Sequence, residues 1–171
     1  MKKLIVKHGL YASLVVVGIP LLMWTLTDGE PNYDLGEIIG YATMVLCMTF
    51  VFLGIREYRN HELNGSISFG QALKVGVLIA LIPSVAFGVY DLIYVIWLDP
   101  DFYDTYYAQY IEEMKNTMPE SELEKALADM EAQKELFMNP FMQFLVMFLT
   151  VFLIGFVISL ISSMVLKRAE A

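Results

Sequence analysis

The chain has 171 residues, of which 57% are hydrophobic and 18% are charged, and its mean hydropathy is +0.57. Soluble domains are about 45–50% apolar and about 25% charged on average, so this composition indicates an integral membrane protein. The net charge of −8 excludes the basic surface that nucleic-acid binding needs. The single cysteine cannot form an internal disulfide. One cysteine and two histidines also provide few ligands for a zinc site.

Four apolar runs are each long enough to cross the roughly 30 Å hydrocarbon core of a bilayer as a helix. We expect these spans at about 10–26, 38–55, 75–98 and 141–166. Ser68 and Gln71 form a capping-box pattern before the third span, and Asn139-Pro140 is a typical helix start before the fourth. The sequence therefore predicts an all-α membrane protein whose four transmembrane helices form a single domain, a four-helix bundle, over residues 1–171.

The distribution of Lys and Arg predicts how these spans are oriented. Eight of the 11 Lys and Arg residues lie before the first span, around the connection between the second and third, and after the fourth. The other three lie in the connection over residues 99–139. By the positive-inside rule, both termini are expected in the cytoplasm and residues 99–139 outside.

Residues 99–139 have the pattern of two amphipathic helices, which predicts an extracytoplasmic helical hairpin. We expect Asp99 and Pro100 to start its first helix. Four tyrosines recur there at three- and four-residue steps: Tyr103, Tyr106, Tyr107 and Tyr110. Such a stripe either packs within the hairpin or on lipid, which we favour, or serves as a docking surface for a partner.

The third span carries the one carboxylate inside the four apolar runs, Asp91. A carboxylate inside a membrane span is energetically costly and is a functional hypothesis by default. With no cationic partner in any span, we expect it to be either protonated and hydrogen-bonded to hydroxyls such as those of Tyr41, Thr43 or Thr150, or ionised beside water or a cation in an outward-facing cavity. Asp91 is then either a hydrogen-bonded link between helices, which we favour, or the proton- or cation-binding site of a small carrier.

Small residues predict where the helices approach closely. Those of the third span recur every four residues and share a helix face with Asp91: Gly76, Ala80, Ser84 and Gly88. Gly36 and Gly40 form a close-approach pattern at the start of the second span, and Gly155 and Ser159 lie in the fourth. We expect all eight residues to be at helix–helix contacts.

No nucleotide-binding loop, nucleophile motif or metal-ligand spacing is present in the sequence. Asp99, Asp101 and Asp104 lack the glycine and the terminal glutamate of a calcium loop. We therefore expect no catalytic residues, no metal and no cofactor, and we expect that the protein is not an enzyme.

The segments Phe52-Leu53-Gly54-Ile55-Arg56-Glu57-Tyr58-Arg59 and Gly65-Ser66-Ile67-Ser68-Phe69-Gly70-Gln71-Ala72-Leu73-Lys74-Val75-Gly76 resemble the bacterial membrane family known as domain of unknown function 4199. The resemblance covers nearly the whole chain, including its length, its four spans and the long third connection. It implies the inner membrane of a Gram-negative bacterium, with the hairpin in the periplasm. The family has no established activity, so no residue roles follow from it.

Two functions remain open on these observations. The first is a non-enzymatic inner-membrane protein that acts through helix packing and through its outer hairpin. Its expected partners are the lipid bilayer, a second copy of the chain, or a membrane or periplasmic protein. The alternative is a small proton- or cation-coupled carrier component that uses Asp91.

Overall fold

The computed structural model describes residues 1–27 and 33–168. The helices of this part are α1 (Lys2–Leu26), α2 (Tyr33–Cys47), α3 (Thr49–His61), α4 (Phe69–Ile93), the π-helical turn η1 (Tyr94–Leu98), α5 (Phe102–Thr117), α6 (Glu120–Phe137) and α7 (Pro140–Leu166). Four stretches of them are long and apolar enough to cross a membrane: Lys2–Leu26, Leu35–His61, Phe69–Leu98 and Pro140–Leu166. The predicted all-α architecture is confirmed, as is the presence of four helices able to span a membrane.

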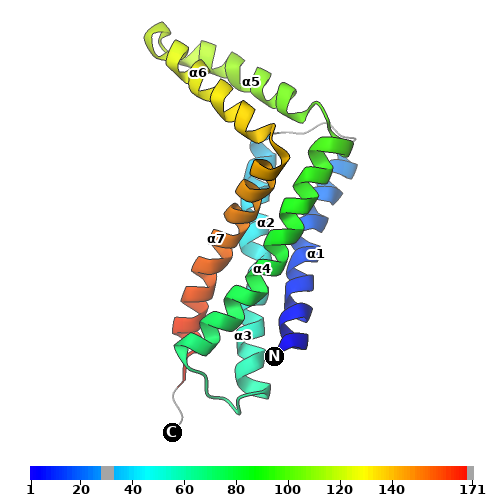
Figure 1. The fold of residues 1–171 in the computed structure, drawn as a ribbon, viewed down its shortest axis with the longest axis vertical. Helices are drawn as coiled ribbons and strands as arrows, with labels where there is room; N and C mark the ends of the chain where they lie inside the picture. The colour runs from blue at the N-terminus through cyan, green and yellow to red at the C-terminus, as the bar shows by residue number, and fades with distance from the viewer. Residues whose placement is uncertain (28–32, 169–171) are drawn as a thin grey trace. The chain divides into compact units, whose positions relative to one another are not determined.

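The chain divides into two compact units, and α4 and α7 each contribute to both. The first unit comprises Met1–Phe87 and Met147–Ala171. Its helices α1, α2 and α3 lie beside the first part of α4 and the second part of α7 (Figure 1). The largest fully buried apolar side chains of its core are Val16, Met48, Val51, Ile55, Val75, Ile79 and Val151. Many apolar side chains on the outside of these helices are exposed, as expected of surfaces that face lipid.

The second predicted span is broken into two helices at Met48, which the sequence analysis did not expect. The amide of Met48 donates to the Val45 carbonyl at 3.2 Å, and the amide of Val51 donates to the Met48 carbonyl at 3.0 Å. Both bonds reach back three residues rather than four, so the helix is locally tightened. The Thr49 hydroxyl and the Cys47 thiol also donate to carbonyls three residues earlier, and such bonds compete with the helical ladder.

The predicted start signals of α4 and α7 are confirmed. The Ser68 hydroxyl accepts from the Gln71 amide at 3.3 Å, and the Gln71 side chain accepts from the Ser68 amide at 3.1 Å, which completes the capping box. At α7, the Asn139 Oδ1 accepts from the amide of Phe141 at 3.0 Å. These caps fix the position at which each of the two helices begins.

The second unit comprises Gly88–Val146. In it, α4 continues into η1, which ends where the Asp99 amide donates to the Tyr94 carbonyl at 2.8 Å. The prediction that Asp99 and Pro100 start the next helix is wrong, because Asp99 is instead the C-cap residue of the π turn. Helix α5 begins at Phe102, with Asp101 as its N-cap residue.

Candidate functional site

Asp91 of α4 is hydrogen-bonded to Gln143 of α7 inside the second unit. The Gln143 Nε2 donates to the Asp91 Oδ2 at 2.7 Å, and Gln143 is only 3% exposed. This donor is an amide that the sequence analysis did not select, rather than one of the expected hydroxyls. Of the two expected partners on α2, Tyr41 is exposed and Thr43 is buried. The bond joins two candidate spans, as the helix-linking interpretation of Asp91 requires.

The position of Gln143 follows from the start of α7. Asn139 caps this helix, and its carbonyl accepts from the Gln143 amide at 2.9 Å. Gln143 therefore lies in the first turn, with its side-chain amide available to a neighbouring helix. Gln143 is also the one carboxamide residue in the fourth apolar run, at residues 141–166, and this feature of the sequence points to it as a partner for Asp91.

The tyrosines of α5 form a continuous aromatic cluster with Tyr94 and Phe102. The ring centroids of Tyr94 and Phe102 are 5.5 Å apart, those of Phe102 and Tyr106 are 5.8 Å apart, and those of Tyr106 and Tyr110 are 5.1 Å apart. Tyr107 is 7% exposed, whereas Tyr110 is 41% exposed. The four predicted docking tyrosines thus differ, since the Tyr107 side chain is buried within the second unit whereas the Tyr110 side chain is exposed and accessible to a partner.

One ion pair and one cation–π contact, both made by Lys134, link α6 to α5. Lys134 of α6 donates to Asp104 of α5 at 2.6 Å, and its ammonium lies 5.9 Å from the centre of the Tyr107 ring. The hydrogen bond from Lys134 to Asp104 raises the pKa of Lys134. Burial raises the pKa of both Tyr103 and Tyr107, and the charge of Asp91 raises that of Tyr103 further. The two phenols are therefore neutral and the ammonium is charged at neutral pH.

Most of the negative charge of the chain lies in this connection. Residues 99–139 contain 11 Asp and Glu but only three Lys, a net charge of −8. The whole chain has the same net charge, so its other residues are neutral in sum. Several of these carboxylates are exposed: Asp104, Glu112, Glu122, Glu124, Asp129 and Glu131.

The helix-packing residues predicted in the third and fourth spans are buried. A Cβ atom at Gly76 would lie 2.8 Å from the Ser159 Oγ, and one at Gly88 would lie 2.8 Å from the Phe144 ring. A Cβ atom at Gly155 would lie 2.7 Å from the Ala80 Cβ. Ser84 and Ser159 are fully buried, and each hydroxyl donates to the carbonyl four residues earlier.

Gly36 and Gly40 do not lie at a close approach to another helix within the part of the chain that the structure describes. Beyond the neighbouring backbone of α2, no described atom lies within 4 Å of a Cβ built at either position, so the contact expected for this pair is not present there. The physical reason is that Gly36 lies on an exposed part of α2 and Gly40 is only partly covered.

A second polar pair, which the sequence analysis missed, joins α1 to α3 in the first unit. The His8 Nε2 lies 2.8 Å from the Glu57 Oε2, and the Lys7 Nζ donates to Glu57 at 2.8 Å. His8 is 5% exposed, and its Nδ1 has no hydrogen-bond partner within the described part of the chain. The sequence alone does not reveal this pair, because His8 and Glu57 can be recognised as partners only once α1 and α3 are known to be neighbours.

Replacing Glu57 with leucine is expected to lower the free energy of unfolding by about 1–3 kcal/mol, because it leaves both ring nitrogens of buried His8 without a partner. The matched control is Glu62→Leu, which removes an exposed carboxylate that pairs with the N-terminal ammonium and should change stability by less than about 0.5 kcal/mol. SDS titration in mixed micelles, followed by circular dichroism, measures both. Equal effects of the two substitutions would contradict a special contribution of His8.

Within residues 1–27 and 33–168, no group of three or more His, Cys, Asp or Glu side chains is placed to hold a metal ion. In the candidate spans, the structure instead joins helices through polar contacts such as Asp91 with Gln143 and His8 with Glu57. In each of these contacts a carboxylate meets side-chain nitrogen groups, which suits a structural link.

Comparison with known proteins identifies the family of this chain. The family described as "Protein of unknown function (DUF4199)" matches residues 7–168, which is nearly the whole chain. The chain therefore belongs to this family, as its sequence motifs indicated. No curated protein and no solved structure matches it.

Proposed function

We propose that this member of the DUF4199 family is a non-enzymatic protein of the bacterial inner membrane that presents α5 and α6 outside as an acidic docking hairpin. The observation that carries the proposal is that one set of side chains joins α5 to α6 while a different set, mostly carboxylates, is exposed on these helices. The Lys134–Asp104 ion pair and the contact of the Lys134 ammonium with the Tyr107 ring join α6 to α5, while most of the carboxylates remain exposed. A partner with a basic surface fits this hairpin by charge complementarity.

The proposed orientation rests on the distribution of cations. Eight Lys and Arg residues lie near the start of α1, around the connection of α3 to α4, and at the end of α7. These are the cytoplasmic segments under the positive-inside rule. The α5–α6 connection, with a net charge of −8, is then outside, where it is repelled by anionic lipid headgroups and remains accessible to a protein.

Site-specific photo-cross-linking in the native membrane tests the proposal. A photoreactive phenylalanine at Gln109, which is exposed on α5, is expected to give an adduct of defined mass with a basic membrane or periplasmic protein. The matched control is Leu153 of α7, an exposed apolar position in a candidate span, which should give lipid adducts.

The adduct should also depend on the acidic surface. Glu122→Gln, Glu124→Gln and Asp129→Asn together are expected to lower its yield at least about tenfold, since each rim charge speeds association. Lys115→Gln with Lys125→Gln, also exposed on this connection, should leave the yield unchanged or increase it. No adduct from Gln109, or an adduct that survives the loss of the three carboxylates, would contradict an acidic docking hairpin.

The helix-linking interpretation of Asp91 fits this proposal better than the carrier interpretation. Gln143 donates to the carboxyl group and is itself almost fully buried. The bond supports a bundle that anchors and positions the α5–α6 connection at the end of α4 and the start of α7.

A further inference from the structure

The first unit contains eight Lys and Arg and seven Asp and Glu, but its cations gather near the start of α1, around the connection of α3 to α4, and at the end of α7. Eight Lys and Arg residues belong to it: Lys2, Lys3, Lys7, Arg56, Arg59, Lys74, Lys167 and Arg168. Of its carboxylates, Glu57 pairs with Lys7 and His8, and Glu62 pairs with the N-terminal ammonium. Within the described part of the chain, the other seven cations have no carboxylate partner at ion-pair distance.

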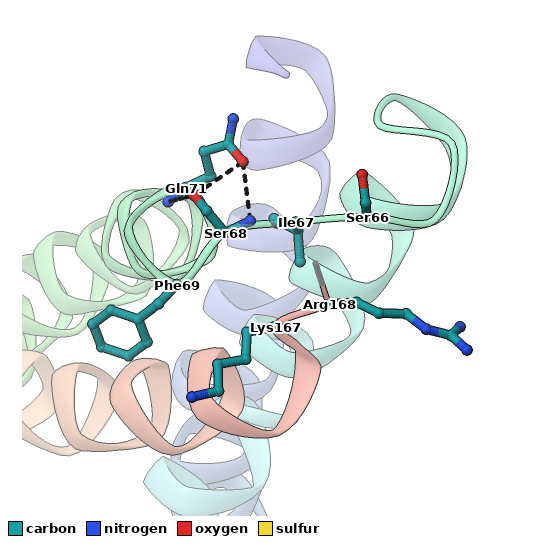
Figure 2. A pocket seen from close by; sticks show the side chains of 7 residues that line it. All are labelled: Ser66, Ile67, Ser68, Phe69, Gln71, Lys167 and Arg168. Carbon is teal, nitrogen blue, oxygen red and sulfur yellow. Dashed lines mark hydrogen bonds between the residues drawn. The ribbon is translucent and has the colours of Figure 1, made fainter. Parts of the chain in front are cut away.

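Two of these cations line a groove between the start of α4 and the end of α7 (Figure 2). The Ile67 amide donates to the Arg168 carbonyl at 3.0 Å, and the Arg168 amide donates to the Ile67 carbonyl at 2.9 Å. This backbone pairing fixes the positions from which the Lys167 and Arg168 side chains extend. Within residues 1–27 and 33–168, no carboxylate lines the groove, whose residues are Ser66, Ile67, Ser68, Phe69, Gln71, Lys167 and Arg168.

We propose that this groove binds the phosphate headgroup of an anionic phospholipid. The groove lies where two candidate spans end, Phe69–Leu98 at its start and Pro140–Leu166 at its end, and this is the level at which headgroups lie. Phe69 is 37% exposed and extends to the same side as Lys167, where it offers an apolar contact to an acyl chain, whereas Arg168 extends to the opposite side (Figure 2). Basic pockets between transmembrane helices are typical sites for anionic headgroups. The proposal does not depend on the docking role of α5 and α6.

Native mass spectrometry of the purified full chain tests the site, with phosphatidylglycerol and phosphatidylcholine offered at equal concentrations. We expect the unaltered protein to retain phosphatidylglycerol preferentially. Lys167→Gln with Arg168→Gln should lower that affinity about 25-fold, at about fivefold for each lost charge. The matched control is Lys115→Gln with Lys125→Gln, which removes two exposed cations from α5 and α6 and should retain the preference.

Two further measurements make the result decisive. The charge-conserving pair Lys167→Arg with Arg168→Lys should bind as the unaltered protein does, which separates loss of charge from loss of folding. Inorganic phosphate at ten times the lipid concentration should not displace phosphatidylglycerol. Equal losses in the groove variant and the control variant would overturn the proposal, because binding would then follow net charge alone. Displacement by inorganic phosphate would also overturn it, in favour of a soluble anion.

Discussion

Replacing Gly155 with leucine is expected to lower the free energy of unfolding by about 1–3 kcal/mol, the usual cost of overpacking a close-packed interior. A Cβ atom at this position would lie 2.7 Å from the Ala80 Cβ and 2.9 Å from the Met48 Cε. The methionine end can rotate away, but the Ala80 Cβ is fixed to the backbone of α4. Relief therefore requires α4 and α7 to move apart around buried Ser84 and Ser159.

The matched control is Gly40→Leu, which makes the same substitution in a candidate span where a Cβ meets no atom within 4 Å. Leucine is a better helix former than glycine by up to about 1 kcal/mol, so stability should be unchanged or slightly higher. SDS titration of both variants in the same micelles compares them directly. If Gly40→Leu proved as destabilising as Gly155→Leu, an interface at Gly40 with a second copy of the chain would be indicated instead.

This contrast between glycines shows what sequence spacing can predict about helix packing. The four-residue period of Gly76, Ala80, Ser84 and Gly88 marks a face that is buried in the structure. The same four-residue spacing of Gly36 and Gly40 does not correspond to a contact with another described residue, although the two sequence patterns look equally convincing. The spacing of small residues in the sequence predicts which of them share a helix face. Which neighbouring helix covers that face, if any, depends on how all the helices of the chain pack together.

The spans themselves were predictable because hydropathy over about 20 residues is a strong signal. Their ends were predictable where side chains cap the backbone, as Ser68 and Asn139 do. The break at Met48 and the π turn at Tyr94–Leu98 were not, because no glycine or proline marks them in the surrounding sequence, residues 41–53 and 89–98. Such local changes of helical pitch arise from competition between individual backbone hydrogen bonds.

The candidate site was predictable only in part. Asp91 is recognisable from sequence because a carboxylate within an apolar span is rare. Its partner was not recognised, because the partner's identity depends on which residue of α7 lies at the level of Asp91. The same holds for His8, whose interaction with Glu57 joins residues that are far apart in the chain.

Replacing Gln143 with leucine is expected to be costly because of what it leaves behind. The Asp91 carboxyl group would lose the amide that donates to it at 2.7 Å, and a polar group left unsatisfied in an apolar interior costs about 1–3 kcal/mol. Asp91→Asn should be nearly neutral, since the side-chain oxygen of asparagine still accepts from Gln143. SDS titration of the two variants in mixed micelles measures both effects.

The double variant Asp91→Leu with Gln143→Leu decides between the two interpretations of Asp91. For a helix link, removing both polar partners should restore most of the stability lost by Gln143→Leu, because no unsatisfied group remains. For a proton or cation site open to water, Gln143→Leu alone should cost little, since water would solvate the carboxylate. A double variant no more stable than Gln143→Leu would contradict the link. The bond joins the end of α4, which precedes α5, to the start of α7, which follows α6. Its loss should therefore also disturb the position of α5 and α6 and weaken cross-linking from Gln109.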